Sequence, residues 1–133
     1  MYKLINWIDT DKINWDWLSN NLNAVYLLQH NLDKVNWSVL SRNPNAIHLI
    51  EENQDKINWD IEGYRGLGLS SNPNAIHLLE KYIDKLNWYG LSWNPNAIQL
   101  LEQNQDKINW YLLSKNPNAI HLLEKNIDKL NWD

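Results

Sequence analysis

The apolar and polar residues of this chain follow a pattern of two short blocks, which recur with a period of 22 residues. The first block reads Asn-Pro-Asn-Ala-Ile-His-Leu. Near-copies of it begin at Asn43, Asn72, Asn94 and Asn116, and a weaker copy begins at Asn21, where Leu22 replaces the proline. The second block reads Asp, Lys, an aliphatic residue, Asn and Trp, and its copies begin at Asp11, Asp33, Asp55, Asp84, Asp106 and Asp128. Such self-similarity at a fixed spacing is typical of solenoid proteins, in which each unit packs only on its neighbours.

The first block predicts a short helix with one apolar face. In the copy that begins at Asn116, this asparagine is a good N-cap, and Pro117 stands at the first helical position, where its missing N–H costs nothing. Apolar residues follow from Ala119 at i, i+3 and i+4, so they share one side of the helix. Asn126 can adopt the left-handed conformation that ends a helix. We therefore predict a helix over residues 117–125 and over the equivalent residues of the other copies.

The second block predicts another short helix. Asp106 or Asn109 could cap it, and we favour Asn109, which places Trp110, Leu112 and Leu113 on the apolar side. Both helices are shorter than the ~12 residues that an isolated helix needs to persist in water. They can form only when they are stacked on neighbouring units, and the short loops make each pair an antiparallel hairpin.

These elements predict an all-α fold, an αα-hairpin solenoid of about five 22-residue repeats. The whole chain, 1–133, would form a single repeat domain. It divides into an N-terminal capping element over 1–20 and repeats over 21–42, 43–71, 72–93, 94–115 and 116–133. The repeat over 43–71 carries an insertion, 62–68, that holds three of the four glycines. No Lys-Ser/Thr pair follows these glycines and no strand precedes them, which favours a bulging loop over a phosphate-binding loop.

Tryptophans recur at one equivalent position, directly after the asparagine of the second block. They are Trp15, Trp37, Trp59, Trp88, Trp110 and Trp132. Each indole can bury on the order of 200 Å², so a row of them could supply much of a core. We predict that these rings form a buried ladder between adjacent repeats. The alternative is an aromatic cage or a base-stacking platform, but identical residues in every copy suit structure better than recognition.

Composition narrows the class of protein. The formal net charge is -4 at pH 7, and the chain has no cysteine. The charge weighs against nucleic acid and anionic membranes as partners, and the missing thiols exclude disulfides, thiolate metal sites and cysteine nucleophiles. No signal peptide opens the chain, and no segment approaches the ~18 uninterrupted apolar residues of a membrane span. We therefore expect an intracellular protein that does not bind a membrane.

The recurring polar residues offer no catalytic or metal-binding set. His48, His77 and His121 share one outward position, but equivalent atoms of stacked helices lie about 8–10 Å apart, so we expect solvated side chains and no metal. A row of lysines could track phosphates, yet the flanking aspartates and glutamates indicate a mixed, solvated surface. No distinct pair of histidine and carboxylate activates one of the serines. The sequence therefore predicts a protein that is not an enzyme and needs no cofactor.

Binding candidates are found at positions where otherwise identical units differ, because a packed position would hold residues of one size. The position after the recurring tryptophan holds Asp16, Ser38, Asp60, Tyr89 and Tyr111, and the last position of the unit holds Asn20, Arg42, Ser71, Trp93 and Lys115. Aromatic residues and arginine are enriched in interface hot spots. The partner-binding candidates are Arg42, Tyr89, Trp93, Tyr111 and Lys115, together with Tyr64 and Arg65 of the insertion. Trp93 could instead fold over the gap that Gly90 leaves three residues earlier.

The two blocks together resemble the short repeat proteins of mimivirus-like giant DNA viruses. The resemblance covers nearly the whole chain, from about Asp11 to Trp132, and the frequent Asn, Ile and Lys agree with an AT-rich viral genome. The seven-residue insertion and Leu22 depart from the regular pattern. The resemblance implies an origin and a setting, the host cytoplasm or the virion.

A repeat surface without catalytic residues predicts a binding function. We expect a non-enzymatic scaffold for an unidentified protein partner of the host or the virus. A modular nucleic-acid-binding protein is the second hypothesis. A self-assembling structural protein is the third, because the chain stops at Trp132-Asp133, within an expected second helix, and this open end could bind another copy.

Overall fold

The computed structural model describes residues 9–57, 59 and 68–130, and every regular element in this part of the chain is a helix. The α-helices are α1 (Trp15–Asn20), α2 (Val25–Gln29), α3 (Trp37–Leu40), α4 (Ile47–Glu52), α5 (Ile76–Lys81), α6 (Trp88–Trp93), α7 (Ile98–Gln103), α8 (Trp110–Leu113) and α9 (Ile120–Glu124). The 3-10 helices are η1 (Thr10–Lys12), η2 (Pro44–Ala46), η3 (Gln54–Lys56), η4 (Leu69–Ser71), η5 (Ile83–Lys85), η6 (Gln105–Lys107) and η7 (Ile127–Lys129). The predicted all-α class is confirmed. Of these described helices, none is long and apolar enough to cross a membrane.

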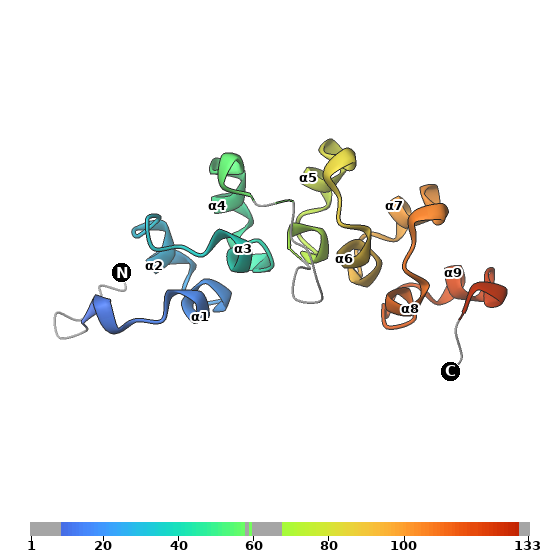
Figure 1. Ribbon diagram of the computed structural model, residues 1–133, viewed down its shortest axis with the longest axis horizontal. Coiled ribbons are helices and arrows are strands. Elements are labelled where there is room, and N and C mark those ends of the chain that lie inside the picture. The colour runs from blue at the N-terminus through green and yellow to red at the C-terminus, as the bar shows by residue number, and fades with distance from the viewer. Residues whose placement is uncertain (1–8, 58, 60–67, 131–133) are drawn as a thin grey trace.

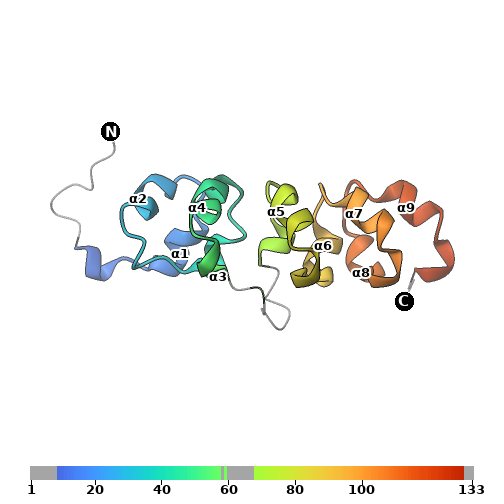
Figure 2. The same cartoon turned by 90° about the horizontal axis from the view of Figure 1, so that it is seen from above.

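The helices form two rows that run side by side along a bent rod. Figure 2 shows α2, α4, α5, α7 and α9 in one row, and α1, α3, α6 and α8 in the other. In Figure 1 the second of these rows follows the inner side of the bend, so we call it the inner row and the first the outer row. Successive inner elements touch: α1 contacts α3, and α6 contacts both η4 and α8. η4 therefore stands in the inner row between α3 and α6.

The outer-row helices begin later than predicted. In the copy at Asn116, the side-chain Oδ1 accepts a hydrogen bond from the backbone N–H of Asn118 at 3.0 Å, two residues on. This bond closes a local turn instead of capping an α-helix. The Asn116 carbonyl then accepts from the N–H of Ala119 at 3.2 Å, and α9 starts only at Ile120. The predicted helix over 117–125 is therefore wrong at its start, because Pro117 lies in the turn. In the copy at Asn43 the asparagine does cap a helix, the 3-10 helix η2, and Pro44 is its first residue, as predicted.

The outer-row helices also end differently from the prediction. Asn126 has a φ of -134°, and no described residue other than glycine has a positive φ. Its Nδ2 instead donates to the carbonyl of Leu122 at 2.9 Å. The equivalent Asn31, Asn53 and Asn104 donate in the same way to Leu27, Leu49 and Leu100. A side-chain amide thus satisfies a carbonyl that the end of the helix leaves without a partner, so no left-handed residue is needed.

The inner-row helices begin where the sequence places them. Asn109 caps α8, since its Oδ1 accepts a hydrogen bond from the N–H of Leu112 at 3.0 Å. Asn14, Asn36 and Asn87 cap α1, α3 and α6 with the same bond. The choice of Asn109 over Asp106 is confirmed. These helices have only four to six residues, so packing on neighbouring units must stabilise them.

Buried asparagine side chains join each unit to the one before it. Asn94 is fully buried, and its Nδ2 donates to the carbonyls of Ser70 at 3.0 Å and Asn72 at 2.9 Å. Its Oδ1 accepts from the N–H of Asn96 in its own unit at 3.0 Å. We call the residues that repeat this arrangement the asparagine ladder: Asn43, Asn72, Asn94 and Asn116. In each ladder amide the Nδ2 group donates hydrogen bonds and the Oδ1 atom accepts one, so the buried polar atoms have partners.

A serine adds a second link between units on the inner row. The Ser92 hydroxyl donates to the Trp88 carbonyl at 2.7 Å and accepts from the backbone N–H of Asn109 in the next unit at 2.9 Å. Ser19 makes the same pair of bonds, to Trp15 and Asn36. The hydroxyl therefore binds back to its own helix, as the sequence suggests, and also fixes the start of the next inner helix.

Aliphatic residues, and not the recurring tryptophans, fill the core. The largest fully buried apolar side chains are Leu28, Leu40, Ile50, Leu79, Leu91, Leu101, Leu113 and Leu122. Trp15, Trp37, Trp59, Trp88 and Trp110 are partly buried and pack against this core, while Trp132 lies outside the described residues. The predicted row of tryptophans is therefore confirmed only in part: the described rings pack against the core, but they are half-buried and not enclosed.

Lysines from the following unit cover some of these half-buried rings. The ammonium of Lys107 lies 4.9 Å from the ring centroid of Trp88, and that of Lys129 lies 4.8 Å from Trp110. Such cation–π contacts contribute about 0.5–1 kcal/mol at exposed sites. The lysine row is thus not a uniformly solvated surface, although Lys12 and Lys56 pair with the nearby carboxylates of Asp9 and Asp55.

The insertion over 62–68 lies outside the described residues except for its last glycine. Gly68 has a φ of 47° and a ψ of -151°, a conformation that favours glycine because a Cβ would clash. It leads directly into η4, whose Leu69 and Ser70 are buried. The chain therefore returns to the inner row immediately after the insertion.

We expect Asn94→Ala to lower the free energy of unfolding by about 3 kcal/mol, because three hydrogen bonds are lost and two carbonyls lose a donor. Urea unfolding followed by circular dichroism measures this change. The matched control is Asn96→Ala, which removes one exposed bond to the Pro73 carbonyl and should cost less than about 1 kcal/mol. Equal effects of the two substitutions would show that the ladder does not hold the units together.

Candidate binding surface

Three positions of each inner-row unit hold residues that differ between units. They are the first, second and fifth residues after the recurring tryptophan, so the fifth stands four residues after the first and three after the second, on the same side of the helix as each of them. In the first unit these are Asp16, Trp17 and Asn20; in the later units they are Tyr89, Gly90 and Trp93, and Tyr111, Leu112 and Lys115. The structure therefore places the variable positions of the sequence along the inner row.

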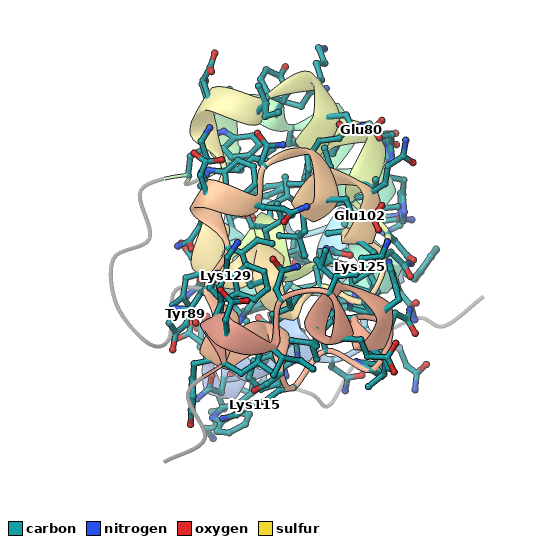
Figure 3. The ribbon with its side chains drawn as sticks, turned by 90° about the vertical axis from the view of Figure 1, so that its right-hand side faces the viewer. Glu80, Tyr89, Glu102, Lys115, Lys125 and Lys129 are labelled. Carbon is teal, nitrogen blue, oxygen red and sulfur yellow. The ribbon has the colours of Figure 1, made fainter. Side chains whose placement is uncertain are left out.

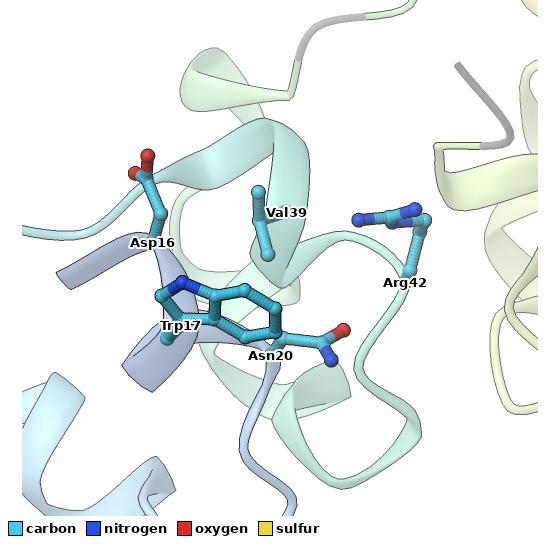
Figure 4. A pocket seen from close by; sticks show the side chains of 5 residues that line it. All are labelled: Asp16, Trp17, Asn20, Val39 and Arg42. Carbon is cyan, nitrogen blue, oxygen red and sulfur yellow. The ribbon is translucent and has the colours of Figure 1, made fainter. Parts of the chain in front are cut away.

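A shallow hollow of about 180 Å³ lies between α1 and α3 (Figure 4). Its lining residues are Asp16, Trp17, Asn20, Val39 and Arg42. Trp17 is 76% exposed. The Asp16 Oδ1 accepts a hydrogen bond from the Nδ2 of Asn36 at 2.7 Å. Arg42 is half-buried and forms no ion pair within the described ranges, although the Asp16 carboxylate lines the same hollow.

Trp17 is the exposed residue that the sequence analysis does not select. The sequence does contain a sign of this exposure. The second position after the recurring tryptophan holds Trp17, Val39, Gly90 and Leu112, and these residues differ greatly in size. Leu112 is nevertheless 2% exposed, whereas Trp17 is largely open to solvent. The difference follows from place in the row: α6 precedes and contacts α8, whereas α1 is the first inner-row helix of the described chain.

Tyr111 and Lys115 form a second cluster at α8. The Lys115 ammonium donates to the Tyr111 hydroxyl oxygen at 3.0 Å and lies 4.3 Å from the centroid of the same ring. This hydrogen bond, and then the positive charge, lower the pKa of Tyr111 below its ordinary value of 10.0, because both favour the phenolate. Tyr111 is 57% exposed, so the pair is open to a partner.

The remaining candidates do not meet at one site. Trp93, the last residue of α6, is 43% exposed, and Tyr89 of the same helix is half-buried. Tyr64 and Arg65 fall outside the described residues. Figure 3, an end-on view, places Tyr89 on one side of the rod and Lys115 at the bottom. The candidates are thus spread along the inner row instead of converging on one pocket.

The outer row carries a different pattern, in which histidines pair with glutamates of the preceding unit. The Nε2 of His77 lies 2.5 Å from the Oε1 of Glu51, and the Nε2 of His121 lies 2.7 Å from the Oε1 of Glu102. These two histidines are about half exposed, in line with the expected solvated side chains, and each also contacts one carboxylate. Within the residues that the structure describes, no group of three or more His, Asp or Glu side chains is arranged to hold a metal ion.

We expect Lys115→Gln to raise the pKa of Tyr111 toward 10, because the substitution removes the positive charge that stabilises the phenolate. A pH titration by NMR of tyrosine labelled at the ring carbon beside the hydroxyl measures it, with the Tyr111 signal assigned from its loss in Tyr111→Phe. Lys125→Gln is the control, since this lysine follows the outer-row helix α9 and does not contribute to the lowered pKa of Tyr111. An unchanged pKa in Lys115→Gln would contradict the contact.

Comparison with known proteins identifies no relative of this chain. No protein-family model, no curated protein and no solved structure matches it. The resemblance to the repeat proteins of giant viruses therefore stays a prediction. The functional argument rests on the exposed side chains of the inner row and on the chemistry that they can perform.

Proposed function

We propose that this chain is an αα-hairpin solenoid of about five 22-residue repeats that serves as a non-enzymatic scaffold for a protein partner. The inner row is its binding face. The observation that supports this proposal is the exposure of large aromatic side chains along that row: Trp17 at 76%, Trp93 at 43% and Tyr111 at 57%. Exposed aromatic residues of this size are the commonest anchors of protein interfaces.

The direction of the bend also supports the inner row as the binding face. Solenoids use their concave side to bind extended partners, because neighbouring units there present side chains to one ligand. The inner row follows that side in Figure 1. The resemblance to giant-virus repeat proteins leads us to propose further that the partner is a host or viral protein inside the infected cell.

Selection from a displayed library of 12-residue peptides tests the scaffold. We expect peptides that bind the wild-type chain to lose about tenfold in affinity with Trp93→Ala or Tyr111→Ser, as interface anchors do. Gln99→Ala, on the outer row, is the control and should bind as the wild type does. The melting temperature of Trp93→Ala is measured in parallel, because a side chain that only fills the gap beside Gly90 would lower stability without changing affinity. A library that yields no binder would contradict the proposal.

Deletion of residues 94–115 tests the repeat architecture. The deletion removes one period and joins Trp93 to Asn116, which can then bond to the Ser70 and Asn72 carbonyls as Asn94 does. We expect a helical protein that still unfolds cooperatively, with a smaller urea m-value because less surface is buried. Deletion of 94–104 removes half a period and should leave the following residues unfolded. Similar behaviour of the two deletions, by circular dichroism, would rule out a modular array.

A further inference from the structure

We propose that the hollow between α1 and α3 receives one glutamate side chain from an extended segment of the partner protein. This inference rests on the proposed scaffold function and adds the chemistry of the partner. The hollow is the one lined by Trp17, Asn20, Val39 and Arg42, with Asp16 at its edge (Figure 4).

The size of the hollow selects a single side chain. Its volume of about 180 Å³ is below the ~300–1,000 Å³ of typical small-molecule and cofactor sites. A hollow of this size on a helical surface suits one amino-acid side chain of a larger partner, which makes its other contacts elsewhere along the inner row.

The lining residues select a carboxylate. Arg42 presents a guanidinium with five N–H donors, and none of the described carboxylates pairs with it. A carboxylate can accept two parallel hydrogen bonds from this group, which is the strongest pairing open to it. Asn20 adds an amide at the rim of the same hollow. The free cation therefore has one natural complement, an acidic group of the partner.

The aromatic wall selects glutamate over aspartate. Trp17 exposes 76% of its surface and forms one side of the hollow, with Val39 beside it. The two methylene groups of a glutamate can lie along the indole while the carboxylate reaches Arg42, in the way that long charged side chains cover apolar surface with their stems. Aspartate has one methylene group and covers less of the ring.

Asp16 does not reverse this choice. Its Oδ1 accepts the 2.7 Å hydrogen bond from the Asn36 amide, so this oxygen is bonded to Asn36 and not to Arg42. In Figure 4 the Asp16 carboxylate points away from the Trp17 ring, whereas the Arg42 guanidinium points toward Val39. A basic side chain placed over Trp17 would face the Arg42 cation across the hollow.

The distribution of cations favours a peptide over single-stranded nucleic acid. A nucleic acid needs several phosphate contacts along its backbone. Lys107 and Lys129 instead lie over tryptophan rings of the preceding units, and Lys115 is bound to Tyr111. One unpaired arginine suits one carboxylate, and the net charge of -4 opposes a polyanion.

The test uses peptides selected on the full chain from the same 12-residue library. We expect glutamate to be enriched at one peptide position. In titration calorimetry, a Glu→Gln change in the best peptide and Arg42→Gln in the protein should each weaken binding about tenfold, and the two changes together should cost little more than one. Trp17→Ala should weaken binding by a similar factor, and Arg42→Glu should recover affinity for a Glu→Lys peptide. Lys125→Gln, at the end of the outer-row helix α9, is the matched control for loss of one positive charge.

The outcomes separate this inference from the scaffold function. Peptides without glutamate enrichment, or unchanged binding by Arg42→Gln with a wild-type circular dichroism melt, would overturn the inference. If those peptides still depend on Trp93 and Tyr111, the scaffold function is supported and the glutamate-binding hollow is not. If no peptide binds, the result contradicts both proposals. Binding of a 12-residue oligouridylate that is lost with Arg42→Gln, in the absence of peptide binding, would assign the hollow to nucleic acid instead.

Discussion

The hydrogen bonds of buried asparagine side chains hold this molecule together. In each described junction one amide reaches from its own turn to two backbone carbonyls of the preceding unit, as Asn94 does with Ser70 and Asn72. Water cannot replace these bonds where the side chain is fully buried, so a junction that failed to form would leave polar groups unpaired in the interior. The bonds also fix the register, because an amide displaced by one residue along the neighbouring chain would miss both carbonyls.

This constraint explains how helices of four to six residues persist. Alone, such helices would melt, since a single turn fixes many dihedral angles for few bonds. Here their ends are closed by side chains: Asn109 caps the start of α8, and the Asn126 amide covers a carbonyl at the end of α9. Their apolar faces lie against the leucines of the adjacent unit. Local capping and contacts between units thus stabilise the same residues, and neither is sufficient without the other.

The sequence predicts the features that depend on neighbouring residues along the chain. Helical class and the cap at Asn109 follow from spacing and local hydrogen bonding, and both are confirmed. The helix start at Asn116 is not predictable locally, because sequence pattern gives this asparagine a capping role, whereas its amide bonds to Ser92 and Asn94 in the unit before. The depth of the tryptophans is not predictable either, because hydrophobicity does not show that these rings lie half-buried against the core.

The candidate surface was predictable to a similar degree. Variation between units identified Trp93, Tyr111 and Lys115, which are exposed. The same criterion applied one position earlier would have found Trp17, whose exposure depends on its place in the row and not on its type. The pairing of Arg42 with that ring in one hollow could not be read from the chain, because it requires the spacing of α1 and α3.

One junction of the ladder spans the insertion and remains the same as the others. Asn72 donates to Ser41 at 2.9 Å and to Asn43 at 3.2 Å, although 29 residues, and not 22, separate it from the equivalent Asn43. Extra chain can therefore enter a unit before η4 without disturbing the bonds on either side. A foreign loop of similar length can therefore be grafted at this position while the framework on either side keeps its geometry.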